Sequence, residues 1–158
     1  MSRQSIAPAI AAALIGLSAV LASSSTANAA ERSFTIAAFE AKGGATTDKE
    51  PFPAAPLPAG EGYGLKKPDA TGRWEVNAYI WLPNQITVNQ GDDVTLEFVG
   101  INGATHPVSI SGYNKSFELK RGTSTKISFK ADKAGVFRID CGLHMPTMTA
   151  ELIVTPVK

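Results

Sequence analysis

Residues 136–148 read Val-Phe-Arg-Ile-Asp-Cys-Gly-Leu-His-Met-Pro-Thr-Met, a short strand-like run followed directly by a loop. Successive side chains of a strand point to opposite faces, so Phe137, Ile139 and Cys141 share one face while Arg138 and Asp140 share the other. Cys141 is therefore predicted to point inward at the end of a core strand. A β-branched run at 149–155 predicts the next strand, which closes a hairpin around the loop.

The same pattern extends through most of the chain. Short β-branched and aromatic runs alternate with turn sequences, and no segment has the sustained spacing of an amphipathic helix. About eight strands at this spacing predict an all-β Greek-key sandwich or barrel. The expected strands are 33–39, 74–81, 86–88, 94–99, 108–111, 117–119, 124–129, 136–141 and 149–155.

Composition divides the chain into three parts: a leader at 1–29, an N-terminal strand with a proline- and glycine-rich excursion at 30–73, and a regular β domain at 74–158. Within the middle part, residues 42–72 hold five of the ten prolines and show no periodicity. We expect a long surface excursion there, partly polyproline-like. The sequence contains no internal repeat.

The leader has the features of a secretory signal peptide. Arg3 precedes an apolar run at 6–22, and Ala27-Asn28-Ala29 fits the small-x-small cleavage pattern. An uncleaved membrane anchor is the alternative, but the run is slightly short for a span. We expect export and cleavage after Ala29, to the periplasm or, in an organism without an outer membrane, to the exterior, with no membrane anchor left.

Charge and cysteine content narrow the possible partners. Removal of the leader takes away one basic residue, so the 15 basic residues fall to 14 and equal the 14 acidic ones. A neutral chain gives no electrostatic reason to expect nucleic acid or an anionic membrane as partner. One cysteine cannot form an internal disulfide, and a free thiol in an oxidising compartment needs burial or a metal.

Soft and imidazole metal ligands are scarce after the leader and mostly clustered. Two imidazoles, one thiolate and a thioether are the donors of a trigonal copper site with a weak axial methionine. Zinc shares the two histidines and the cysteine but gains nothing from a thioether. A Cys–His nucleophilic pair lacks an identifiable orienting group. We predict one copper ion, cycling between Cu(I) and Cu(II), bound by His106, Cys141, His144 and Met148.

Met145 has three interpretations. It could compete with Met148 for the axial position, or it could simply pack within the loop. With Leu143 and Pro146 it could instead form an apolar collar around the exposed edge of His144, which would suit brief docking of a redox protein.

Residues 74–157 resemble the cupredoxins. The likeness rests on Gly91-Asp92 before an alternating strand, on a histidine about fifteen residues later, and on Ala-Asp-Lys-Ala-Gly at 131–135 before the cysteine strand. The Cys-x2-His-x3-Met spacing from Cys141 completes it. Among cupredoxins the chain is most similar to single-domain relatives of nitrosocyanin and of the copper domains of cytochrome oxidase subunit II and nitrous oxide reductase.

The departures from these relatives are informative. Binuclear copper domains carry two cysteines, and this chain has one. The red copper relatives have a carboxylate where His106 stands and a second histidine where Met148 stands, so both positions favour a mononuclear blue site. In many cupredoxins the residue after the upstream histidine donates its N–H to the cysteine sulfur. Here that residue is Pro107, which has no N–H, and a lower reduction potential is expected.

The leader implies export, and the resemblance implies a protein that shuttles single electrons between a redox donor and an acceptor docking near His144. No substrate pocket is implied, and we do not expect an enzyme. Two alternatives stay open: a periplasmic copper storage or delivery protein, and a red-copper catalytic relative whose axial position is vacant.

Overall fold

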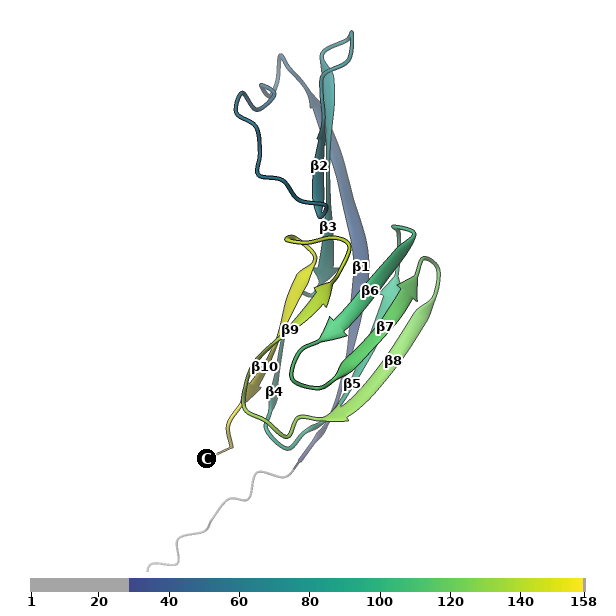
Figure 1. The fold of residues 1–158 in the computed structure, drawn as a ribbon, viewed down its shortest axis with the longest axis vertical. Helices are drawn as coiled ribbons and strands as arrows, with labels where there is room; N and C mark the ends of the chain where they lie inside the picture. The colour runs from purple at the N-terminus through teal and green to yellow at the C-terminus, as the bar shows by residue number, and fades with distance from the viewer. Residues whose placement is uncertain (1–28, 158) are drawn as a thin grey trace, which may run out of the picture.

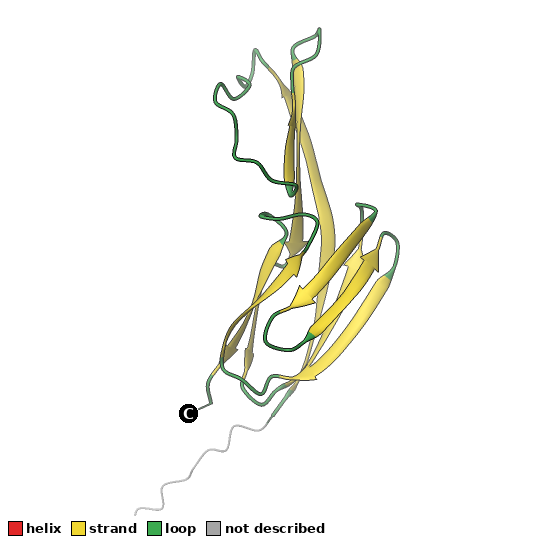
Figure 2. Cartoon of the chain, viewed as in Figure 1, coloured by secondary structure: helices red, strands yellow, loops and turns green. Residues whose placement is uncertain are grey.

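The computed structural model describes residues 29–157. These residues form two β-sheets packed face to face (Figure 1). No helix occurs among them (Figure 2), and so none that is long and apolar enough to cross a membrane. Apart from Ala29, the predicted signal peptide lies outside the described residues.

Each sheet has five strands, in the orders β2-β3-β1-β5-β8 and β4-β10-β9-β6-β7. β1 pairs in parallel with β5 and β4 with β10, and the remaining pairs are antiparallel. Strands distant in sequence are neighbours in both sheets, so the chain crosses repeatedly between them. The strands are β1 Glu31–Thr46, β2 Tyr63–Lys66, β3 Arg73–Leu82, β4 Gln85–Asn89, β5 Asp93–Gly100, β6 Thr105–Ile110, β7 Lys115–Lys120, β8 Ser124–Lys130, β9 Gly135–Cys141 and β10 Thr149–Thr155.

The all-β sandwich predicted from the sequence is confirmed, with ten strands in place of about eight. Nine of the ten strands correspond to the nine ranges expected from the sequence, and β2 corresponds to none of them; β1 continues to Thr46 instead of ending near residue 39. Both extra stretches lie where the sequence showed no period. They are held by backbone pairing with β3 rather than by burying one face, and a ladder of that kind leaves no hydrophobic alternation in the sequence.

The core lies between the two sheets and follows the alternation of their strands. Every second residue of β5 is buried, and Leu96 and Phe98 have no exposed surface. Ile139 and Leu152 face them from the other sheet and are equally buried. Trp81 meets Phe98 edge-on, with ring centroids 5.6 Å apart. Each such side chain contributes about 1.5–3 kcal/mol to stability, so the sandwich forms a firm base for its loops.

β1, β3 and β2 continue beyond the sandwich as a three-stranded arm (Figure 1). The last β1 residue paired with β5 is Ala38, so the arm begins there. Glu40 lies opposite Tyr79 in the β1–β3 ladder, two residues into the arm. The proline-rich residues 47–62 run back from the tip of the arm toward the loop between β9 and β10 (Figure 1).

Asp92 joins the start of the described chain to the sandwich. The residue is 1% exposed, and its carboxylate accepts hydrogen bonds from the backbone N–H groups of Ala30 and Asn89, both at 2.9 Å, and from Arg32 Nε at 3.2 Å. The hydrogen bond from Ala30, followed by that from Asn89, lowers the pKa of the Asp92 carboxyl. This carboxylate therefore holds β1 at the entrance of its sheet.

Candidate metal centre

The loop between β9 and β10 is closed by backbone hydrogen bonds at its base. Cys141 N–H donates to the Met148 carbonyl at 3.0 Å, and Met148 N–H donates to the His144 carbonyl, also at 3.0 Å. Gly142 N–H donates to the carbonyl of Pro107 at 2.9 Å, which ties the loop to β6. These bonds fix the ends of the loop against two core strands.

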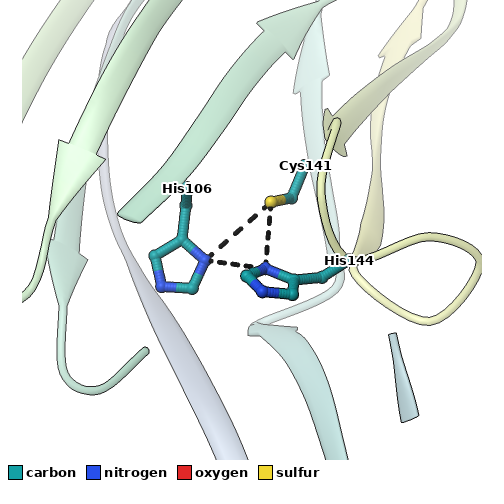
Figure 3. A group of neighbouring side chains, drawn as sticks. All are labelled: His106, Cys141 and His144. Atoms are coloured by element: carbon teal, nitrogen blue, oxygen red, sulfur yellow. Dashed lines mark hydrogen bonds between the residues drawn. The ribbon is translucent and has the colours of Figure 1, made fainter. Parts of the chain in front are cut away.

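Three donor atoms converge at this end of the sandwich (Figure 3). His144 Nδ1 lies 3.2 Å from His106 Nδ1 and 3.3 Å from Cys141 Sγ, and that sulfur lies 3.8 Å from His106 Nδ1. A triangle with these sides has a circumscribed radius of about 2.0 Å. That radius is close to the ~2.0–2.3 Å lengths of metal–nitrogen and metal–sulfur bonds, so the three side chains fit a single cation.

His106 is held in the orientation that a ligand requires. It lies within β6, not in the loop before the strand as the sequence suggested, and it is fully buried. Its Nε2 lies 2.9 Å from the carbonyl oxygen of Asn102. That carbonyl accepts only a protonated nitrogen, so the Nδ1 lone pair is left free to bind a metal. Gly103 makes room for the ring, because a Cβ there would lie 2.8 Å from His106 Cε1.

The pKa values of the Cys141 thiol and the His144 imidazole are both shifted. Burial raises the pKa of the Cys141 thiol, while the backbone N–H groups of Leu143 and His144 oppose that shift. Burial, and next the nearby His106, lower the pKa of His144. A neutral imidazole is the form that binds metal, and a cation would displace the thiol proton.

The two methionines of the loop occupy different surroundings. Met148 is fully buried in the core cluster beside Cys141, and its role as axial ligand stays a prediction. Met145 is partly buried, and its carbonyl accepts hydrogen bonds from the N–H groups of Glu61 at 3.1 Å and Gly62 at 3.0 Å. The proline-rich segment therefore contacts the loop at Met145. Leu143 is 43% exposed at the outer surface.

Two residues at the site were not anticipated from the sequence. The Tyr79 ring of β3 stacks on the His144 ring, with centroids 3.7 Å apart and an interplanar angle of 14°. Gly62 lies against the loop so closely that a Cβ there would overlap the His144 carbonyl and the Thr147 hydroxyl. Tyr79 carries no sequence signal, since an aromatic residue in a strand is ordinary. The glycine was visible only as part of an irregular segment.

A cluster of two histidines and a cysteine at one end of a β-sandwich, with only one of the three partly exposed, is typical of cupredoxins. The chain belongs to the cupredoxin-like domain family, whose model matches residues 63–154. Membership of this family implies copper binding, and the three donors fit that metal. No curated protein matches the chain.

Solved structures of copper proteins share the fold. The multicopper oxidase mgLAC is 20% identical over 81% of this chain and 40% of its own, with a TM-score of 0.53. The copper nitrite reductase of Nitrosomonas europaea is 18% identical over 80% and 42%, with a TM-score of 0.54. The copper nitrite reductase of Thermus scotoductus SA-01 is 19% identical over 81% and 28%, also at 0.54. This chain therefore spans less than half the length of each.

Proposed function

We propose that this protein is an electron-transfer cupredoxin with a mononuclear type 1 copper site. His106, Cys141 and His144 would hold the ion, and Met148 would be its fourth and weakest ligand. The observation that carries the proposal is the convergence of one sulfur and two imidazole nitrogens within 3.8 Å of one another. When bound, copper would supply a centre that accepts and returns one electron.

The protein's own contribution is to keep the donors in place. Cys141 and His106 lie on strands of one sheet and are fully buried, so packing restricts both side chains. The hydrogen bond from His106 to the Asn102 carbonyl and the stacking of Tyr79 on His144 restrict the two rings further. A donor set that moves little is suited to both oxidation states, which favours rapid electron transfer over chemistry on a substrate. We accordingly propose no enzymatic activity.

We further propose that the protein is exported and that its redox donor and acceptor dock near His144. The leader sequence at 1–29 supports export. His144 is only partly buried, and Leu143 and Pro146 are exposed beside it. An apolar rim around a partly exposed ligand suits brief association with another protein.

The test is the visible spectrum of copper-loaded protein. We expect an intense thiolate-to-copper absorption band at about 600 nm that is absent from Cys141→Ala and is shifted in Met148→Leu. A copper-loaded protein without such a band would contradict the proposed site. A moderate copper chelator separates electron transfer from delivery: retention of the band over hours supports the former, and rapid loss supports a delivery protein. A band shifted by azide would indicate an open coordination position.

A further inference from the structure

Glu40 is a nearly buried carboxylate beside the metal centre. It lies in β1 just where the arm begins, and it is 9% exposed. Burial of a charged group is costly unless partners compensate it. Asn77 Nδ2 donates to Oε1 at 3.1 Å, and Lys42 Nζ lies 3.1 Å from Oε2. The lysine is 65% exposed, so water screens its positive charge. A buried negative charge thus remains close to the site.

The main chain of Glu40 is connected to the His106 ring through Asn102. Its N–H donates to Asn102 Oδ1 at 2.6 Å, and its carbonyl accepts from Asn102 Nδ2 at 3.0 Å. The carbonyl of Asn102 is in turn the acceptor for His106 Nε2. The Asn102 side chain therefore fixes the acceptor that orients His106, by anchoring it to β1 of the opposite sheet.

The side chain of Glu40 lies beside Tyr79, whose ring contacts the His144 ring. Glu40 and Tyr79 are directly opposite in the antiparallel β1–β3 ladder, so their side chains lie on the same face. Burial and the Glu40 carboxylate raise the pKa of Tyr79, as expected of neighbours. The Tyr79 ring stacks on His144, and the backbone N–H of Tyr79 donates to the Gly62 carbonyl at 2.7 Å.

We infer that Glu40, Asn102 and Tyr79 form a support that positions both imidazoles, and that the Glu40 charge lowers the reduction potential of the site. The inference rests on the proposed function. Asn102 positions His106, Tyr79 positions His144, and Glu40 joins the two. A negative charge stabilises Cu(II) relative to Cu(I), because the oxidised centre carries one more positive charge.

The charge is tested by voltammetry of copper-loaded variants. We expect Glu40→Gln to raise the reduction potential and Lys42→Met, which removes the counter-charge, to lower it. Glu75→Gln is the matched control, because it makes the same charge change on the same arm. Glu75 precedes Tyr79 by four residues in β3 and lies closer to the tip of the arm, so its replacement should leave the potential unchanged. An equal shift in Glu40→Gln and Glu75→Gln, or a potential unchanged in Glu40→Gln, overturns the inference.

Positioning is tested separately for each ring. Tyr79→Leu should broaden the copper electron paramagnetic resonance signal and speed copper loss to a chelator, whereas Tyr79→Phe, which keeps the ring, should resemble the natural protein. Asn102→Ala should have the effect of Tyr79→Leu. Circular dichroism checks that each variant is folded. Tyr79→Leu with unchanged resonance and chelator rates overturns the role of the stack.

The metal-free protein supplies a measurement independent of copper. Stacking on Tyr79 shields the His144 ring protons, so their NMR resonances should move downfield in Tyr79→Leu and stay in place in Tyr79→Phe. No downfield shift would refute the support even if the copper spectrum were as proposed. Conversely, the expected shift in a protein without a thiolate–copper band would leave the support standing and refute the proposed function.

Discussion

Pro107 lies in β6 directly after His106, and its ring nitrogen carries no hydrogen. Its carbonyl accepts the N–H of Gly142, so the residue holds the β9–β10 loop without donating to the sulfur. The N–H groups of Leu143 and His144 both act on the thiol.

Restoring the missing donor should change the potential. We expect Pro107→Asn to raise the reduction potential, because a further hydrogen bond to sulfur withdraws electron density and favours Cu(I). A stabilisation of about 1.4 kcal/mol corresponds to ~59 mV for one electron, and the shift should be of that order. Voltammetry measures it, and Pro156→Asn, near the C-terminal end of the described chain, is the control. A fall in potential would contradict the expectation.

The clustered side chains His106, Cys141 and His144 were easier to predict than their surroundings. Strand alternation alone placed Cys141 inward, because the period of two is independent of the partner strand. The position of Tyr79 against His144 depends on how β3 meets the β9–β10 loop, and these elements are more than sixty residues apart. No local pattern encodes such a contact. Asn102 was visible only as part of an Asn-Gly turn, and its bonds to Glu40 follow from tertiary packing.

At the scale of elements, the end of the proline-rich segment holds the β9–β10 loop. Residues 60–62, which make these contacts, are called the clamp below. Besides the two hydrogen bonds to the Met145 carbonyl, the hydroxyl of Thr147 donates to the Gly62 carbonyl at 2.6 Å. The same carbonyl accepts the N–H of Tyr79. The clamp therefore joins the loop to β3. The sequence predicted an excursion over the surface but gave no indication of where it would bind.

Gly62→Ala tests the clamp. A methyl group would collide with the His144 carbonyl and the Thr147 hydroxyl, so we expect a loss of about 1–3 kcal/mol in the free energy of unfolding, together with faster copper loss. Gly43→Ala is the control, because its Cβ would meet only Val76 Cγ1 at an ordinary 3.6 Å. Denaturant titration gives the first quantity and chelator kinetics the second. Equal behaviour of the two variants would show that the clamp is dispensable.

At the scale of the whole molecule, the start of β1 is linked to the predicted processing of the leader. The expected cleavage after Ala29 would convert the N–H that Ala30 donates to Asp92 into a charged amino group. An ammonium beside a buried carboxylate is attracted more strongly than an amide. The mature chain should therefore be more stable than one that retains residues before Ala30.

Thermal unfolding checks this expectation. A chain that begins at Ala30 should melt at a higher temperature at pH 6 than one extended by Ala27–Ala29, and Asp92→Asn should abolish the difference. Because the Asp92 pKa is lowered on folding, its stabilisation is present above its ordinary value of 3.8 and is lost as the pH falls below that value. Identical melting temperatures for the two chains would exclude the ion pair.

The contacts of residues 60–62 have a consequence for protein engineering. Grafting the stretch from Cys141 to Met148 onto another β-sandwich would assume that this loop keeps its structure by itself. Here a distant part of the chain, residues 60–62, is hydrogen-bonded to Met145 and Thr147 of the loop. A recipient scaffold given the eight-residue loop alone would receive Cys141 and His144 but neither His106 nor the contacts that residues 60–62 make with the loop. We expect a transplanted loop to keep its structure only when residues 60–62 and the neighbouring part of β3 are transplanted with it.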